Sequence, residues 1–90
     1  MRNIKVNGDR LWQSLMEMAK IGATEKGGVC RLALTDEDKA ARDLYVEWCE
    51  AAGCTVSVDE MGNIFARRPG KVDSLPPICT GSHIDSQPTG

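Results

Sequence analysis

The sequence predicts an α/β fold made of two amphipathic helices, a β-hairpin and one further strand. Apolar residues recur at three- and four-residue spacing in two separate segments, which is the period of an α-helix. A later segment alternates apolar and polar residues, which is typical of half-buried strands. No helix follows the last strand to cover it. We therefore expect residues 1–90 to be an incomplete N-terminal portion of a larger α/β domain, with no second domain in the chain.

The first predicted helix follows Asp9 and ends near Gly22. Its apolar stripe consists of Leu11, Trp12, Leu15, Met16, Met18 and Ala19. A stripe of this kind needs a partner surface. The next segment, from 23 to 34, has no clear period and is interpreted as a loop. Its Gly27-Gly28 pair suits either the close approach of a ligand or, more simply, a flexible connection.

The second predicted helix has the clearest boundaries. Thr35 is placed to cap its N-terminus, and Asp38 to answer as in a capping box, with Asp in place of the usual Glu or Gln. Gly53 is a stop signal at the other end. The residues of its core-facing stripe are Ala41, Leu44, Tyr45, Trp48 and Ala52.

Residues 54–58 and 63–68 predict the two strands of a hairpin. Gly62-Asn63 lies at the reversal and supplies two residues that tolerate positive φ. After a Pro-Gly turn, residues 76–80 predict a third strand with Ile78 and Cys79 facing inward. This strand would deliver the segment 81–85 at its C-terminal end.

The composition excludes several classes of partner. The chain has 11 basic and 13 acidic residues, a net charge of -2, and no basic stripe to meet nucleic acid or an anionic membrane. The densest basic cluster, Arg67-Arg68 with Lys71, lies beside a turn and is interpreted as a solvated strand end. The polar N-terminus holds no signal peptide and no apolar run is long enough to span a membrane, so we expect a cytoplasmic protein.

The cysteine pattern indicates thiols rather than a metal cluster or disulfides. Cys30, Cys49, Cys54 and Cys79 include no Cys-x-x-Cys spacing. The last three occupy apolar positions of predicted elements, where free cysteine behaves as a small hydrophobe. We therefore expect reduced, buried thiols.

The candidate chemistry lies at the C-terminal end, where His83 is the only histidine and Asp85 follows two positions later. Residues two apart in a strand point to the same side, so both side chains would enter one cavity. Imidazole is a good zinc ligand, and a carboxylate often fixes its tautomer or lies near a catalytic water. Spacing alone leaves open a hydrogen-bonded histidine without metal. A nucleophilic Cys79 or Cys54 served by His83 is a weaker alternative, because the sequence specifies no oxyanion hole or orienting group.

The segment Gly81-Ser82-His83-Ile84-Asp85-Ser86-Gln87-Pro88-Thr89-Gly90 resembles the first metal-binding motif of a family of dinuclear-metal amidohydrolases. This family includes N-carbamoyl-L-amino acid hydrolases, β-ureidopropionases and allantoate amidohydrolases, and is related to zinc aminoacylases and carboxypeptidases. Further matches run in the same order along the chain: Gly27-Gly28-Val29 with Arg31-Leu32, residues 35–42, residues 48–53 and residues 59–63. Cys30 departs from the threonine expected in that loop, which puts a role for the loop in substrate binding in doubt.

The resemblance implies the N-terminal part of a zinc-peptidase-like catalytic domain. It implies two divalent metal ions in the complete enzyme (zinc, manganese, cobalt or nickel), with His83 as a metal ligand and Asp85 as its catalytic partner. The bridging aspartate, a Glu-Glu pair and a distant histidine would lie beyond Gly90, so the chain would hold at most a partial site and be inactive alone. It further implies a homodimer that acts on a small N-carbamoyl or ureido substrate.

Two alternatives to an N-carbamoyl-amino acid hydrolase stay open. One is an allantoate amidohydrolase or a related metallopeptidase or aminoacylase. The residues Ser86-Gln87-Pro88 only slightly favour the N-carbamoyl-amino acid hydrolase over the allantoate amidohydrolase. The other is a non-catalytic truncated remnant or an interaction module. For a truncated piece of a larger domain we also expect exposed apolar surface.

Overall fold

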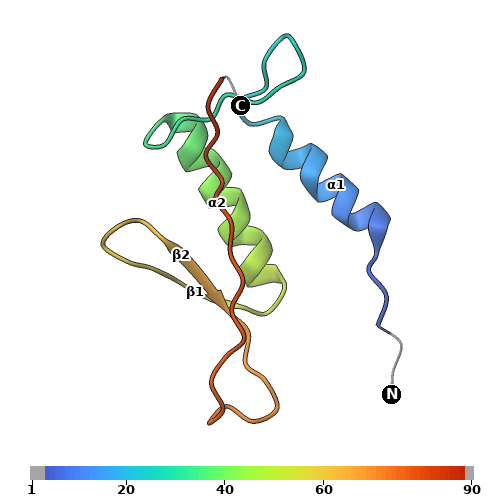
Figure 1. The fold of residues 1–90 in the computed structure, drawn as a ribbon, viewed down its shortest axis with the longest axis vertical. Coiled ribbons are helices and arrows are strands. Elements are labelled where there is room, and N and C mark those ends of the chain that lie inside the picture. Colours follow the sequence, from blue (N-terminus) through green and yellow to red (C-terminus); the bar gives the residue numbers. More distant parts are fainter. Residues whose placement is uncertain (1–3, 89–90) are drawn as a thin grey trace.

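A computed structural model describes residues 4–88 and contains two helices and one hairpin (Figure 1). The helices are α1 (Gly8–Ala19) and α2 (Asp36–Ala51), and the strands are β1 (Thr55–Val58) and β2 (Ile64–Arg67). The hairpin packs against α2. The radius of gyration is 15.3 Å, whereas a compact domain of this length would have about 12 Å. The arrangement is therefore open.

Helix α1 begins earlier than the sequence predicted. The side chain of Asn7 accepts a hydrogen bond from the backbone N–H of Arg10 at 3.0 Å, so Asn7 is the N-cap. Asp9 lies inside the first turn, where its negative charge favours the positive helix end. The helix ends at Ala19, close to the expected stop, and Gly22 follows with a φ of 85°.

The apolar stripe of α1 stays largely open to solvent. Trp12 is 62% exposed and Leu15 is 53% exposed. Figure 1 shows α1 standing apart from α2 and the hairpin. The expected exposed apolar surface is thus confirmed. Among the residues that the structure describes, neither helix is long and apolar enough to cross a membrane.

The N-terminus of α2 has a capping arrangement that differs by one residue from the predicted capping box. The hydroxyl of Thr35 accepts from the backbone N–H of Asp38 at 3.2 Å, as predicted. The Asp38 carboxylate, however, accepts from the backbone N–H of Leu34 at 3.1 Å instead of that of Thr35. The Thr35 N–H donates to the carbonyl oxygen of Leu32. The Asp38 side chain thus satisfies a donor just before the N-cap, instead of the N-cap donor of a capping box.

The small core lies where α2 meets the hairpin. Ala41 is fully buried, and Leu44, Tyr45 and Trp48 are half-buried. These four residues confirm the predicted core-facing stripe. Ala52 is exposed because it lies at the C-terminal cap, beyond the last helical residue.

The hairpin is antiparallel, with Thr55 opposite Arg67 and Val58 opposite Ile64. Gly62 adopts a φ of 88° at the reversal, as predicted. Asn63, which also tolerates a positive φ, does not adopt one. Its backbone N–H and its side-chain amide instead donate to the carboxylate of Asp59, at 2.8 Å and 2.9 Å. These bonds, the side-chain amide bond first, lower the pKa of Asp59.

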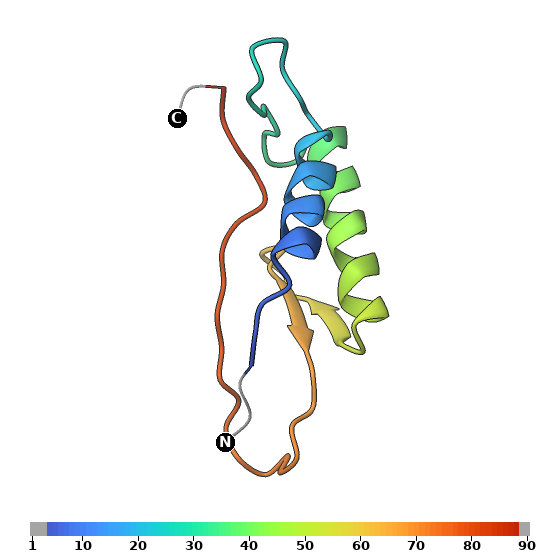
Figure 2. The same ribbon diagram turned by 90° about the vertical axis from the view of Figure 1, so that its right-hand side faces the viewer.

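The predicted third strand, residues 76–80, is extended but is not paired as a strand. Ile78 and Cys79 are exposed, so the prediction that they face inward is wrong for this chain. The physical reason is that a strand needs a neighbour for its backbone groups. Within residues 4–88, the first such pairing along this segment is the bridge between Ser86 and Arg31. Figures 1 and 2 show the segment passing the hairpin without joining its sheet.

The remaining loop predictions are partly confirmed. All four cysteines are free thiols, but three are half-buried and Cys79 is exposed, so the expected burial is wrong. Gly27, with a φ of 86°, and Gly28, whose N–H donates to Thr24, form a tight turn. Arg67 is exposed and makes a 3.5 Å ion pair with exposed Asp73, in agreement with a solvated strand end.

Candidate metal-binding site

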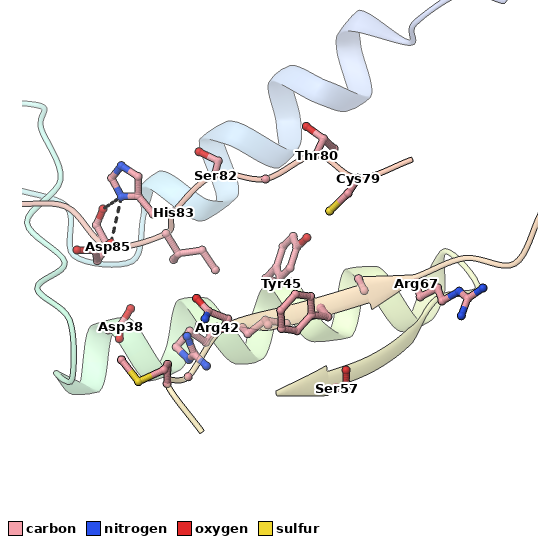
Figure 3. A pocket seen from close by; sticks show the side chains of 18 of the residues that line it. Asp38, Arg42, Tyr45, Ser57, Arg67, Cys79, Thr80, Ser82, His83 and Asp85 are labelled. Carbon is pink, nitrogen blue, oxygen red and sulfur yellow. Dashed lines mark hydrogen bonds and ion pairs between the residues drawn. The ribbon is translucent and has the colours of Figure 1, made fainter. Parts of the chain in front are cut away.

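The structure brings the two predicted site residues together. The Nδ1 atom of His83 lies 3.0 Å from the Oδ1 atom of Asp85 and 3.0 Å from its carbonyl oxygen (Figure 3). Both partners are acceptors, so the neutral imidazole carries its proton on Nδ1. The lone pair on Nε2 is then available to a metal ion, which is the tautomer that a carboxylate commonly fixes in metal-binding histidines.

The local backbone explains this contact without a paired strand. An extended chain places residues two apart on the same side, whether or not it has a sheet neighbour. The His83 side chain is 81% exposed and that of Asp85 is 49% exposed. His83 is therefore not a core residue, and its ring is accessible to a ligand.

The described residues fit one imidazole ligand and its carboxylate partner, and no more. Within residues 4–88, no group of three or more His, Cys, Asp and Glu side chains is close enough to hold a metal ion. A zinc site has four ligands, of which a catalytic site draws three from protein. The donor set is therefore that of a partial site.

The pair borders an open groove of about 1120 Å³ between α2, β2 and the segment 77–85. Figure 3 shows Arg42 and Tyr45 on the α2 side and His83 with Asp85 on the other. A hydrogen bond to the Cys49 thiol and partial burial raise the pKa of Tyr45, so its phenol is neutral at physiological pH. The groove thus has a basic and a phenolic group on one wall and the His–Asp pair on the other.

The alternative nucleophile receives no support from the geometry. Cys79 is exposed and Cys54 is half-buried. The hydrogen bonds of the His83 ring, among the described residues, go to Asp85 and not to a thiol. A cysteine nucleophile needs a base within hydrogen-bond reach.

Arg31 is the site-associated residue to which the sequence gave no role. Its side chain donates through Nε to the carbonyl oxygen of Ile84 at 3.0 Å, and through one terminal nitrogen to Met18 at 2.9 Å and Ile21 at 2.7 Å. Its backbone forms a bridge with Ser86, through N–H to carbonyl bonds of 3.2 Å and 2.8 Å. The available signal was a charged residue between Cys30 and Leu32, in a loop rich in glycine. These contacts fix the backbone on both sides of Asp85.

Ser86 adds a side-chain contact to the same anchor. Its hydroxyl donates to the carbonyl oxygen of Val29 at 2.8 Å and accepts from the backbone N–H of Arg31 at 3.2 Å. The segment 83–86 is therefore tied to the loop that follows α1. The end of the motif, Thr89-Gly90, lies outside the described residues.

Comparison with known proteins identifies close relatives. No family model matches the chain. An N-carbamoyl-L-amino-acid amidohydrolase of Rhizobium meliloti is 53% identical over 88 residues, which are 98% of this chain and 21% of that protein. A ureidoglycolate hydrolase of Arabidopsis thaliana is 34% identical over 86 residues, which are 96% of this chain and 18% of that protein.

Solved structures are also similar to the chain. The crystal structure of an amidase of the hydantoinase/carbamoylase family from Burkholderia multivorans is 72% identical, with a TM-score of 0.92. The match covers 97% of this chain and 21% of that one. The chain thus spans about a fifth of the length of the proteins it matches. As a segment of that length, it belongs to the hydantoinase/carbamoylase family of amidases.

Proposed function

We propose that the chain is part of a metal-dependent hydrolase of linear C–N amide bonds that converts an N-carbamoyl amino acid to the amino acid, carbon dioxide and ammonia. The observation that carries the proposal is the contact between His83 and Asp85, which leaves Nε2 of the imidazole free to bind a metal ion. The names of the relatives support the reaction class.

In this proposal each residue has a distinct role. His83 binds one metal ion through Nε2, and Asp85 holds the Nδ1 proton and so fixes the ring orientation. Asp85 also adds negative charge beside the position of the attacking water. Two divalent ions (zinc, manganese, cobalt or nickel) in the complete enzyme would make that water acidic enough to attack at neutral pH. We propose a cytoplasmic homodimer as the working form.

A second substrate is favoured by one specific observation. A ureidoglycolate hydrolase, named for a different ureido compound, contains a segment that is 34% identical to this chain. An N-carbamoyl amino acid, allantoate and ureidoglycolate share a ureido carbon bonded to two nitrogens. The relative turnover of these three compounds by one preparation therefore distinguishes a carbamoylase from an allantoate amidohydrolase. Turnover of an N-acyl amino acid or a dipeptide would instead favour an aminoacylase or a peptidase.

The alternative from another class is a non-catalytic remnant or interaction module. It is favoured by the partial donor set of residues 4–88. We expect the 90-residue chain alone to be inactive in either case. Metal-dependent release of ammonia from an N-carbamoyl amino acid by this chain would contradict that expectation.

The test uses a chimera in which residues 1–90 replace the matching segment of the Burkholderia multivorans amidase, which is 72% identical. We expect this chimera to bind Zn²⁺ or Mn²⁺ and to release ammonia from an N-carbamoyl amino acid. His83→Ala should lower both metal content and turnover, and Asp85→Asn should lower metal affinity about 10- to 100-fold. Glu60→Gln, at an exposed position in the hairpin turn, is the matched control for loss of an acidic charge. Metal content and turnover that do not change in His83→Ala would rule out the ligand assignment.

A further inference from the structure

Arg31 is a buried charge with an unusual set of partners. It is 7% exposed, and each hydrogen bond that its side chain makes goes to a backbone carbonyl oxygen. A guanidinium in this position is expensive unless its N–H groups find acceptors. Within the described residues, no buried side-chain nitrogen or oxygen lacks a partner. The position of Arg31 is therefore determined by the carbonyl groups around it.

Two of these carbonyl groups belong to the end of α1. Met18 and Ile21 lie in and just after the last turn, where the helix dipole is negative. The Met18 carbonyl group also accepts from the backbone N–H of Ile21 at 3.2 Å, so Arg31 is an additional donor there. The last turn of α1 itself contains no basic residue. Lys20 is the C-cap, but its ammonium group pairs with Glu17 at 2.9 Å. The Arg31 guanidinium adds a buried positive charge to this helix end, and the helix end in turn holds the guanidinium in place.

The third carbonyl group belongs to Ile84, the residue between His83 and Asp85. Arg31 Nε therefore contacts the peptide group that joins the two halves of the candidate metal site. On the other side of Asp85, the bridge to Ser86 fixes the next peptide group. Because the planar guanidinium has donors on two sides, it can hold Ile84 and the end of α1 at the same time.

A glycine makes this approach possible. A Cβ atom on Gly22 would lie 2.6 Å from the carbonyl oxygen of Cys30 and 3.3 Å from the Cβ atom of Arg31. Gly22 also accepts a hydrogen bond from the backbone N–H of Cys30 at 2.8 Å. The end of α1 and the Arg31 loop are thus in direct backbone contact, which gives the guanidinium a rigid base.

We infer that Arg31 is a positioning residue, which orients the His83–Asp85 pair by linking the Ile84 carbonyl to the C-terminal end of α1. This inference rests on the proposed function, since it gives the orientation of the pair a use in metal binding. Arg31 touches neither His83 nor a substrate. Its effect passes through the backbone on both sides of Asp85.

The inference is tested in the same chimera with Arg31→Met, Arg31→Lys and the control Arg10→Met, which removes an exposed charge from α1. Hydrogen–deuterium exchange of the peptide containing Ser86 reports the order of the segment, and chelator competition reports the Zn²⁺ affinity. We expect both Arg31 variants to speed exchange at Ser86 and to weaken Zn²⁺ binding by about tenfold or more. Exchange in α2 should stay unchanged, as should both readouts in Arg10→Met.

The lysine variant separates positioning from a simple charge effect. Lysine keeps the positive charge near the end of α1, but its single ammonium does not reproduce the planar fork that reaches Ile84 as well. If Arg31→Lys restores both Ser86 protection and Zn²⁺ affinity, Arg31 acts only as a helix-terminal charge and the inference is overturned. Unchanged exchange and affinity in both Arg31 variants would overturn it equally.

A second variant covers the case in which the Arg31 variants do not fold. Ser86→Ala removes the hydroxyl contacts to Val29 and Arg31 and leaves the guanidinium intact. It should speed exchange and weaken Zn²⁺ binding in the same direction, and no change in either would count against the inference. If the unaltered chimera binds no Zn²⁺, the proposed function fails, while the exchange at Ser86 still decides whether Arg31 orders the segment.

Discussion

Replacing Gly22 with alanine should destabilise the chain by about 1.5–3.5 kcal/mol, through two separable effects. The first is the backbone conformation, since Gly22 has a φ of 85°. An L-residue with a side chain in this left-handed region costs about 1–2 kcal/mol. The second is steric, because the new Cβ atom would lie 2.6 Å from the carbonyl oxygen of Cys30 and the loop would have to move. That movement weakens the 2.8 Å bond from the Cys30 N–H to the Gly22 carbonyl group, which contributes about 0.5–1.5 kcal/mol.

Gly27 provides a matched control for this substitution. Its φ of 86° is nearly the same, but a Cβ atom there would meet nothing within 4 Å. Gly27→Ala should therefore cost only the conformational part, about 1–2 kcal/mol. The difference between the two variants isolates the close approach of the Arg31 loop to the end of α1.

The measurement is the free energy of unfolding from urea titration of the 90-residue chain, followed by far-UV circular dichroism. We expect Gly22→Ala to lose about 0.5–1.5 kcal/mol more than Gly27→Ala, with an unchanged denaturant slope. Equal losses in the two variants would refute the reasoning, because they would show that the loop tolerates a side chain at Gly22.

Three further predictions follow from local contacts. Thr35→Ala should lower the free energy of unfolding by about 1 kcal/mol because α2 loses its cap, whereas Thr35→Ser should retain most of it; equal losses would contradict the cap. An NMR titration should give Asp59 a pKa below its usual 3.8, and Asn63→Ala should raise it. Since the pKa is lowered on folding, this stabilisation is present above the usual pKa and is lost as the pH falls through the lowered value; a pKa at or above 3.8 would exclude it. Cys79 should react with a thiol reagent faster than the three half-buried cysteines, and equal rates would argue against its exposure.

The elements that could be predicted from the sequence are those specified by neighbours in the chain. Thr35 and Gly53 mark the two ends of α2, and Gly62 marks the reversal of the hairpin. The start of α1 was missed because Asn7 and Asp9 are both good caps, and the sequence alone does not rank them.

The features that could not be predicted depend on distant partners. The His83–Asp85 contact is not one of them, because it follows from two-residue spacing and needs only an extended chain. Arg31 lies 53 positions from Ile84, and no periodicity or motif reports a bond over that separation. The same applies to residues 76–80, whose extended conformation was expected from composition but whose pairing depends on a neighbouring strand.

Apolar packing and hydrogen bonds have different roles near the candidate site. Ala41 is the one fully buried apolar residue among those described, so apolar packing contributes little near the site. Apolar burial is also non-directional and would not by itself set the angle of an imidazole. The hydrogen bonds of Arg31 and Ser86 are directional and converge on the two peptide groups that flank Asp85. If Arg31 positions the His83–Asp85 pair as inferred above, the orientation of the pair should respond to changes at the end of α1 that leave the α2 core intact.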